Sequence, residues 1–368
     1  MTARITGLDS LDRWERYGPW KAARNQAFTG GYFEENAVEE YLNKYADRFD
    51  LFDAAQPWLQ DPRLAAQCPS RTSLNKLVVG RATGNNPVWL SHVTDSAPQT
   101  VRSHEAAWNL LTWLYYGPSG QITPRSVRGQ KESNVTAGPL RSRISFLPLG
   151  RSVYESLIAG LVHPGRYDEG ADPDQAPWEA GALPDPLGIP PCPSGLSGPL
   201  TSRFRHAVLL GSSPDGRTVT DAWITWAWRQ PSAEISDPYL IYDTAKDRAG
   251  MRARSARLDR AVWRDLDALL MEDTGSGTSR RPAVFTTLLD APQDVLDALR
   301  VRAIGFDQDG QGRRQAVVHR HHAARAHAWP PRRVPVRPRH EGHAGSRRTS
   351  RPGPAEGAAT SMGGDRRY

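Results

Sequence analysis

Apolar side chains recur at helical spacing in the first half of the chain. Residues 37–49 and 104–116 each carry them on one face, which predicts two amphipathic helices. In the second of these helices, the expected buried stripe consists of Trp108, Leu111, Leu114 and Tyr115. The helix should stop at the Gly-Pro-Ser-Gly sequence that follows it, because glycine and proline end helices.

The second half of the chain combines helical spacing with alternation. Residues 205–210 and 217–228 alternate apolar and polar positions, and the turn residues 213–216 between them predict a β-hairpin. Residues 258–271 and 294–304 have helical spacing and predict two further helices. Helices and antiparallel strands mixed in this way indicate an α+β fold class.

Composition divides the chain into three parts. Residues 1–165 and 166–311 are expected to form the first and second parts of one globular domain, with a proline-rich connector between Asp172 and Gly198. Residues 312–368 are rich in Arg, His and Pro and have almost no apolar periodicity. Such a segment buries too little surface to offset its chain entropy, so we expect a disordered tail.

Several protein classes are excluded by composition. No apolar run approaches the roughly 18 residues that a membrane span needs, and no signal peptide opens the chain. Two cysteines, Cys68 and Cys192, are too few for a disulfide scaffold and suit a reducing compartment. We therefore expect a cytoplasmic protein with no membrane contact.

The formal net charge of +7 is unevenly distributed. Thirteen arginines and three acidic residues from Gly312 onward give that segment +10, which leaves the preceding residues at −3. Net charge therefore gives no argument that the globular part attracts phosphate, and any nucleic-acid contact there must come from local placement.

The tail allows three interpretations. Its histidines are spaced like metal ligands, but a metal site also needs a rigid frame. A basic tail commonly binds nucleic acid. The interpretation we prefer is a frameshift shortly after Gln311: one permitted choice of GC-rich codons for residues 315–326, read one base displaced, gives Gln-Trp-Phe-Thr-Ala-Thr-Thr-Pro-Pro-Val-Leu, which is more protein-like. The histidines concerned are His319, His321, His322 and His327.

Catalytic motifs do not stand out. The chain has no Gly-x-Ser-x-Gly, His-Glu-x-x-His or Gly-x-x-x-x-Gly-Lys-Ser sequence. His92, His104 and His206 have no obvious carboxylate partner and are expected to be structural, and Cys68 is expected to be a small core residue. An uncharacterised hydrolase-like enzyme that uses the loops in residues 117–140 stays open as an alternative.

Two glycine-containing loops lie close together in sequence, at residues 117–120 and 134–139. Glycine lets the backbone approach a ligand closely, and Arg125, Arg128 and Lys131 between the loops could face a nucleic-acid groove. The alternative is a surface loop with solvated charges. Gln308 and Gln311 lie in a polar stretch where side chains could insert between bases.

These features combine with several longer motifs into a pattern. The motifs are Tyr45–Asp53, Gln56–Asp61, Asn75–Arg81, Gly84–Asn86, Leu114–Gly120, Asn134–Leu140, Asp185–Gly188, Arg203–Ala207 and Gly305–Gln311. With them the chain resembles, over about residues 8–311, the CasA family, the large subunit of the type I-E Cascade CRISPR complex, particularly its actinobacterial branch.

The resemblance implies a binding function and no catalysis. CasA subunits recognise the protospacer-adjacent motif on double-stranded DNA from the minor groove, help to open the strands, contact the guide RNA and other Cascade subunits, and recruit the helicase–nuclease in antiviral defence. Base pairing then reads the target sequence, while protein reads only the short motif. Because the minor groove carries a degenerate code, tolerance of several motifs is expected.

The resemblance also implies which residues carry these roles. It places a DNA-binding glycine loop at Gly117, Pro118, Ser119 and Gly120, and a cationic finger at Arg203. It places a DNA wedge at Asp307, Gln308, Asp309, Gly310 and Gln311. It places a contact with the guide-RNA handle at Trp89, Leu90, Ser91 and His92.

The chain departs from the family pattern at three places. Where some relatives bind zinc through clustered cysteines, it offers only Cys192, so we expect no metal and no cofactor. Relatives begin with an additional segment and end with a four-helix bundle, and we expect both to be absent here, together with the second strand of the wedge. A non-functional fragment of the subunit is therefore the main alternative.

Overall fold

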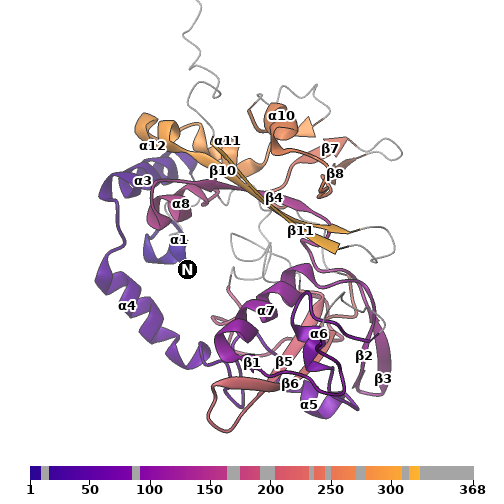
Figure 1. Ribbon diagram of the computed structural model, residues 1–368. Helices are drawn as coiled ribbons and strands as arrows, with labels where there is room; N and C mark the ends of the chain where they lie inside the picture. The colour runs from indigo at the N-terminus through magenta and orange to yellow at the C-terminus, as the bar shows by residue number, and fades with distance from the viewer. Residues whose placement is uncertain are drawn as a thin grey trace, which may run out of the picture. The chain divides into compact units, whose positions relative to one another are not determined.

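The computed structural model describes residues 1–9, 16–84, 92–163, 175–190, 204–231, 236–244, 250–270, 279–308 and 315–323. Residues Met1–Pro330 form one compact unit. Helices and strands are mixed throughout this unit, which confirms the α+β class (Figure 1). No helix in the described ranges has the length and apolar character needed to cross a membrane.

One hydrophobic core, here named the α7 core, forms where helix α7 (Ser103–Tyr116) packs on a small antiparallel sheet. The sheet has the order β1-β6-β5, with β1 at Val101–Arg102, β5 at His206–Ser212 and β6 at Thr218–Trp226. The hairpin β2 (Gly120–Val127) and β3 (Gln130–Val135) and the short helices α5 (Leu64–Gln67) and α6 (Leu74–Leu77) contact this sheet (Figure 1).

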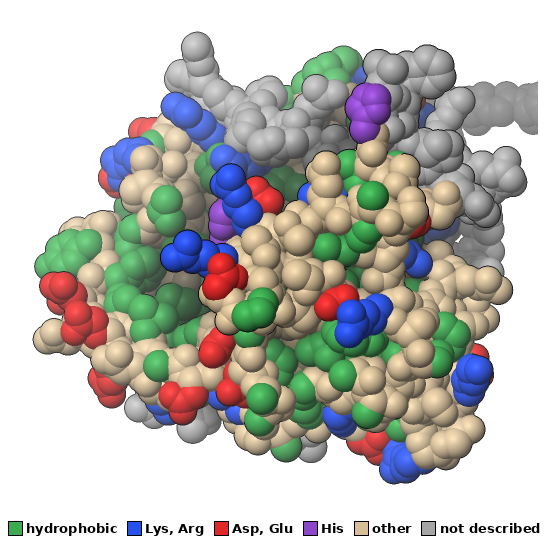
Figure 2. All heavy atoms as spheres, turned by 60° about the horizontal axis from the view of Figure 1, so that its bottom comes forward, with side chains coloured by type: hydrophobic (Ala, Val, Ile, Leu, Met, Phe, Trp, Pro, Cys, Tyr) green, Lys and Arg blue, Asp and Glu red, His purple; other side chains and the backbone are tan. Residues whose placement is uncertain are grey.

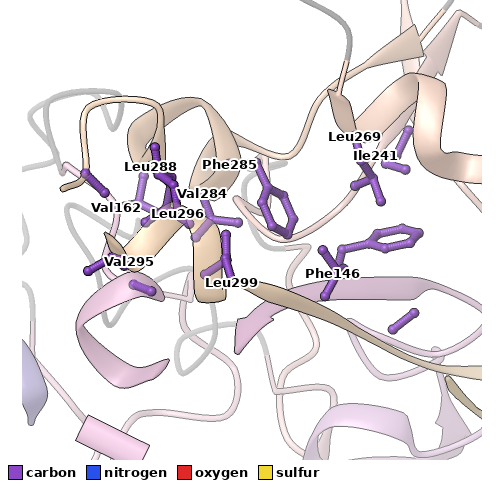
Figure 3. Packing of buried hydrophobic residues seen from close by; sticks show 14 of the residues in the cluster. Phe146, Val162, Ile241, Leu269, Val284, Phe285, Leu288, Val295, Leu296 and Leu299 are labelled. Carbon is purple, nitrogen blue, oxygen red and sulfur yellow. The ribbon is translucent and has the colours of Figure 1, made fainter. Parts of the chain in front are cut away.

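A second core, here named the β10 core, forms around a sheet of order β11-β10-β4. Its strands are β4 (Ile144–Leu149), β10 (Arg300–Gln308) and β11 (Gln315–Ala323). Buried side chains come to it from the helices α3 (Tyr17–Gly30), α8 (Val153–Ala159), α11 (Ala283–Leu288) and α12 (Gln293–Ala298), and from Val262 and Leu269 in residues 262–270. Phe146 and Phe285 are fully buried at its centre, with leucines and valines around them (Figure 3).

A third sheet, of order β8-β7-β9, is smaller. Arg254 holds it together by donating to Asp243 and, at 2.6 Å, to Asp265. The remaining elements are α1 (Thr2–Ile5), α4 (Glu35–Lys44), η1 (Ala46–Arg48), β7 (Tyr242–Thr244), β8 (Met251–Ala253), η3 (Val262–Asp265), α10 (Leu266–Leu270) and β9 (Ser279–Arg280).

The hairpin predicted around residues 213–216 is confirmed, with Val208 opposite Ile224 in its register. The predicted helix at residues 104–116 is also confirmed, but its buried face is different from the one expected. Leu114 is buried as expected, but Trp108 is 70% exposed, and Leu110 and Trp113 are buried in its place. Helical spacing alone allows neighbouring stripes, and contact with β5 and β6 selects one of them.

The helix predicted at residues 294–304 is wrong in its second half. Helix α12 ends at Ala298, and the chain continues as strand β10 from Arg300. Val301 and Ala303 are buried in the β10 core, where the strand pairs with β4. A short apolar run suits either element, and here the pairing partner decides which one forms.

The expectation of disorder from Gly312 onward is wrong for Gln315–Ala323, which forms β11. Its backbone pairs with β10 from Gln308↔Gln315 to Arg300↔Ala323. Unpaired edge groups of β10 gain hydrogen-bond partners in this way. A second strand paired with the first strand of the predicted wedge, which we expected to be missing, is therefore present. The rest of the predicted tail, with His327, lies outside the described residues, as does Cys192.

Candidate nucleic-acid interface

Three segments implicated by sequence meet at the C-terminal end of α7. The Tyr115 ring contacts Phe204 at a centroid distance of 5.3 Å, and the Tyr116 ring contacts Phe306 at 5.4 Å. The next residue, Gly117, packs against the His206 ring. Consecutive residues of one helix end therefore link the glycine loop, the start of β5 and the β10–β11 hairpin.

Gly117 is required by packing. A Cβ at this position would lie 2.5 Å from two His206 ring atoms and 2.6 Å from the Trp113 carbonyl oxygen. His206 is fully buried, and its Nε2 lies 3.0 Å from the Pro118 carbonyl, to which it donates as the neutral tautomer. Burial lowers the His206 pKa to about 4, so the ring is uncharged at neutral pH.

The second glycine-containing loop is hydrogen-bonded to the first loop and to the end of α7. Gly138 N–H donates to the Gly117 carbonyl at 2.8 Å, and Leu140 N–H donates to the Tyr115 carbonyl at 2.9 Å. A Cβ on Gly138 would lie 2.7 Å from the Tyr115 carbonyl oxygen, so only glycine permits this approach. Carbonyls that a helix end leaves unpaired are thereby satisfied by a neighbouring loop.

The glycine loop has a buried half and an exposed half. Gly117 is buried and Pro118 is half-buried, whereas Ser119 and Gly120 are exposed. Gly120 has a φ of 125°, a conformation that strongly favours glycine, and a Cβ there would meet no atom within 4 Å. Of the four predicted loop residues, these last two are the ones open to a ligand.

The wedge prediction falls on a β-hairpin. Phe306 is buried, and Asp307 accepts a hydrogen bond from Leu258 N–H at 2.7 Å. Gln308 ends the paired part of β10, opposite Gln315. The predicted wedge residues Asp309, Gly310 and Gln311 lie outside the described residues.

Arg141 joins the glycine loop to the hairpin. Its Nη1 donates to the Tyr116 carbonyl at 2.8 Å, and its guanidinium carbon lies 4.7 Å from the centroid of the Phe306 ring. Burial lowers the Arg141 pKa to about 10, so the side chain remains a cation at neutral pH. Sequence reasoning missed Arg141, because its position gave no sign of which carbonyl or ring it would meet.

The predicted finger and guide-RNA residues are only partly described. Arg203 lies outside the described residues, and so do Trp89, Leu90 and Ser91. His92 is described and exposed. Asp95, three residues later, accepts hydrogen bonds from Ser73 and, at 2.7 Å, from the backbone N–H of Gly84, so it joins the two chain segments that flank residues 85–91.

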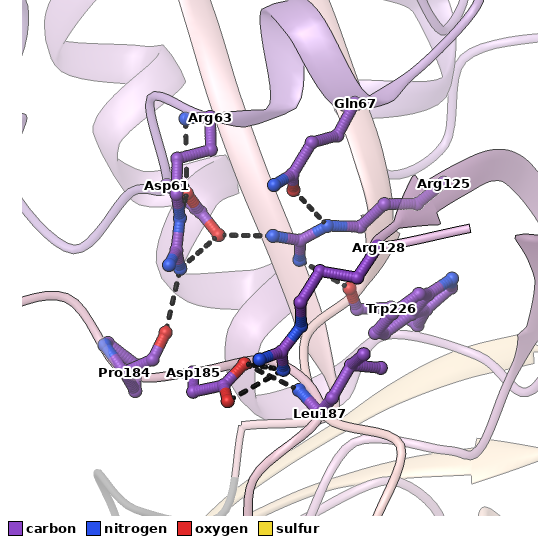
Figure 4. Close-up of polar contacts among 9 residues, drawn as sticks. All are labelled: Asp61, Arg63, Gln67, Arg125, Arg128, Pro184, Asp185, Leu187 and Trp226. Atoms are coloured by element: carbon purple, nitrogen blue, oxygen red, sulfur yellow. Dashed lines mark hydrogen bonds and ion pairs between the residues drawn. The ribbon is translucent and has the colours of Figure 1, made fainter. Parts of the chain in front are cut away.

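The cations between the two loops have different roles. Arg125 is fully buried, donating to Asp61 at 2.7 Å, Gln67 at 2.8 Å and the Trp226 carbonyl at 3.0 Å (Figure 4). It therefore stabilises the α7 core and does not face a ligand. Arg128 is exposed and pairs with Asp185 across 2.7 Å, and Lys131 is exposed.

Charges on the surface are mixed. On the face drawn in Figure 2, acidic and basic side chains are interspersed among apolar ones, without a field of one sign. On this face, a nucleic-acid contact would therefore rest on placed residues and not on a broad basic patch. Within the described ranges, no cluster of three or more His, Cys, Asp or Glu residues could hold a metal ion.

Comparison with known proteins decides the family. The family model described as CRISPR-associated protein Cse1 matches residues 6–328. The chain belongs to the Cse1 family. A curated relative from Thermus thermophilus, the CRISPR-associated protein CasA/Cse1, is 32% identical over 285 residues, which cover 73% of this chain and 48% of the relative.

Solved structures agree with this family and its fold. A chain from a structure titled "CRISPR RNA-guided surveillance complex" is 48% identical with a TM-score of 0.79, covering 88% of this chain and 65% of that one. Thermobifida fusca Cse1 has the same fold, with a TM-score of 0.65 at 18% identity, covering 87% of this chain and 64% of that one. The chain thus spans about half the length of the curated relative and under two thirds of these structures.

The structure brings together residues that the sequence analysis did not name as candidate site residues. Tyr116, Phe306 and Arg141 have no recognisable motif chemistry, and His206 had been expected to be structural, as its buried position confirms. Tyr116 and Phe306 do lie inside matching motifs, at residues 114–120 and 305–311. That position was the available sign that the two rings belong to the interface.

Proposed function

We propose that this Cse1-family chain is the large subunit of a type I-E CRISPR surveillance complex, Cascade, and that its role is binding and not catalysis. The observation that carries the proposal is the 48% identity, at a TM-score of 0.79, with a chain of an RNA-guided surveillance complex. The convergence of three candidate segments on α7 supports it, because such a frame can hold short contacts in fixed positions.

The exposed half of the glycine loop is proposed to approach the minor groove of duplex DNA. Ser119 and Gly120 have no side chain longer than a hydroxymethyl group, so their backbone can come close to base edges. Arg203 would enter the groove beside them, since Phe204, the next residue, packs on Tyr115 near the loop. The short protospacer-adjacent motif is the ligand, and the degenerate minor-groove code predicts tolerance of several motifs.

The β10–β11 hairpin is proposed to act as the wedge that opens the duplex. Its paired strands end at Gln308↔Gln315, and the sequence Asp-Gly-Gln follows at residues 309–311. Side chains inserted at a base step are a known means of unstacking DNA. Gln308 and Gln311 would occupy the space beneath the first base pair after the motif.

Membership of the proposed complex implies further binding partners. The loop at Trp89, Leu90, Ser91 and His92 is proposed to contact the handle of the guide RNA, with Asp95 holding its two flanks together. Further Cascade subunits and the helicase–nuclease would bind elsewhere on the chain, in the cytoplasm.

The test uses the chain assembled with the other Cascade subunits and a guide RNA. Duplexes with a matching target and either a permitted or a scrambled flanking motif are compared by filter binding. Arg203→Ala should reduce the preference for the permitted motif about tenfold, the value of one good groove contact. Arg128→Ala, an exposed arginine paired with Asp185, is the matched control and should leave the preference unchanged.

Two outcomes contradict the proposal. A chain that does not assemble with the other subunits would favour a non-functional fragment. An assembled complex with no motif preference, or with equal preference in wild type and Arg203→Ala, would remove the groove-reading role.

Gln308→Ala should weaken strand opening more than duplex affinity, and an equal loss in both would remove the wedge role.

A further inference from the structure

We propose that Tyr116, Arg141 and Phe306 form a coupling junction that transmits the position of the glycine loop to the wedge hairpin. This inference rests on the proposed function and adds a mechanism to it. Arg141 is a positioning residue in this mechanism: it touches neither DNA nor RNA, but sets where two DNA-contacting segments lie relative to each other.

The junction is adjacent to both segments along the chain. Tyr116 is the last residue of α7 and directly precedes Gly117. Phe306 lies two residues before Gln308, where the paired part of β10 ends. A displacement on either side therefore reaches the junction through one or two peptide units, which have little freedom to absorb it.

The contacts within the junction are directional. Arg141 donates to the Tyr116 carbonyl at 2.8 Å and stacks on the Phe306 ring, with 4.7 Å from the guanidinium carbon to the ring centroid. The Tyr116 and Phe306 rings contact each other at 5.4 Å with an interplanar angle of 36°. A planar guanidinium on a ring face, with a hydrogen bond along its edge, fixes orientation as well as distance.

Each side of the junction is held by backbone hydrogen bonds, and the loop side also by packing. On the loop side, Gly138 and Leu140 tie the helix end by hydrogen bonds, and Tyr115 packs against the α7 core. On the hairpin side, β10 pairs with β4 through Ile304↔Ser145 and with β11 through Phe306↔Val317. The junction is thus a direct contact between the loop that would read the motif and the hairpin that would open the duplex.

The alternative is that Arg141 only stabilises the fold. Arg24 provides the matched control, because it makes the same kinds of interaction with Thr287, Trp20 and Phe28, none of which belongs to either segment. It is fully buried, donates to the Thr287 carbonyl at 2.9 Å and lies 5.1 Å from the Trp20 ring centroid. Burial lowers the pKa of Arg24 as it lowers that of Arg141. Substitution of each arginine by methionine removes comparable local interactions.

The first experiment measures function in the assembled complex. Duplex affinity is measured by filter binding, and opening by fluorescence of 2-aminopurine placed at the first base pair beside the motif. Arg141→Met should slow opening about tenfold, corresponding to one ordinary positioning interaction, while duplex affinity changes less than about twofold. Arg24→Met should leave the ratio of opening to affinity as in wild type. An unchanged ratio in Arg141→Met would overturn the proposal.

The second experiment tests the physical coupling without DNA. Phe306→Leu removes the ring on the hairpin side and leaves the hydrogen bond from Arg141 to Tyr116 available. If the junction couples the segments, hydrogen exchange at the Gly117 and Gly138 amides should accelerate at least about threefold, although neither amide contacts residue 306. Arg24→Met should not accelerate it.

The two experiments separate the two proposals. Accelerated exchange in a chain whose complex shows no motif-dependent opening would keep the junction and reject the proposed function. Motif-dependent opening with unaltered exchange in Phe306→Leu would keep the function and reject the junction. If Phe306→Leu or Arg141→Met does not fold, Arg141→Lys is used, because it keeps the charge but loses the planar stack; it should show the same changes in smaller degree.

Discussion

The glycine loop after α7 and the β10–β11 hairpin, which meet at one junction, are held in place by different forces. The loop depends on side-chain packing: Gly117 fits against the buried ring of His206, and Pro118 accepts its hydrogen bond. The hairpin depends on backbone pairing, with β10 between β4 and β11. A single added carbon at Gly117 should therefore displace the loop, whereas at Asp307 a side-chain change leaves the backbone pairing of the hairpin intact and should cost less.

The difference fits the roles proposed for them. A loop that reads a groove must hold its backbone within a few tenths of an ångström, and close packing gives that precision. A wedge must resist the force of base-pair opening, and a strand paired on both sides distributes that force over many hydrogen bonds. Three predictions test whether the loop is the more fragile of the two.

Acidification should affect the loop most. The His206 pKa falls from 6.5 to about 4 in the folded chain, so between these values the unfolded chain binds a proton that the folded chain does not. The free energy of unfolding should therefore fall as pH falls through this window, by about 3 kcal/mol in total. Urea titrations at pH 7 and pH 4.5 measure it. His206→Gln, which retains a donor for Pro118, should lose this part of the pH dependence; an identical pH profile would contradict the assignment.

Gly117→Ala should come next. The added Cβ meets the Trp113 carbonyl and the His206 ring, neither of which can move freely, so the free energy of unfolding should fall by about 1–3 kcal/mol. Thermal and urea denaturation measure the change. Ser119→Ala, in the exposed half of the same loop, should stay within about 0.5 kcal/mol of wild type. Equal effects of the two variants would show that the loop is not divided as described.

Asp307→Ala on the hairpin should have the smallest effect. The substitution removes the acceptor of the hydrogen bond from Leu258 N–H. Because Leu258 is exposed, water can accept this hydrogen bond instead, so the free energy of unfolding should fall by about 0.5–1 kcal/mol. Hydrogen exchange at the Leu258 amide should accelerate, while exchange at the Gly117 amide should stay as in wild type. Asp259→Ala, which removes only an exposed ion pair with Arg257, is the control and should be nearly neutral. A loss larger than that of Gly117→Ala would reverse the comparison between loop and hairpin.

Local patterns predicted part of this structure well. Helix α7 and the β5–β6 hairpin follow from spacing and turn residues over a few neighbouring positions. The same kind of reasoning was wrong at residues 300–304 and at Gln315–Ala323, where pairing partners distant in sequence decide that strands form. It also offered Arg125 as a groove contact, because a cation in a strand looks the same whether or not Asp61 lies beside it.

Sequence motifs indicated a resemblance to the family, which the family model confirmed, and spacing predicted the α+β class; the segments of the candidate interface were implied by that resemblance. Motifs and spacing did not reveal that Tyr115 and Gly117 contact the segment at the start of β5 while Tyr116 contacts Phe306, or that Arg141 bridges Tyr116 and Phe306; those facts come from the folded chain. Contacts between residues far apart in the sequence depend on how distant segments pack, and no local pattern in the chain carries that information.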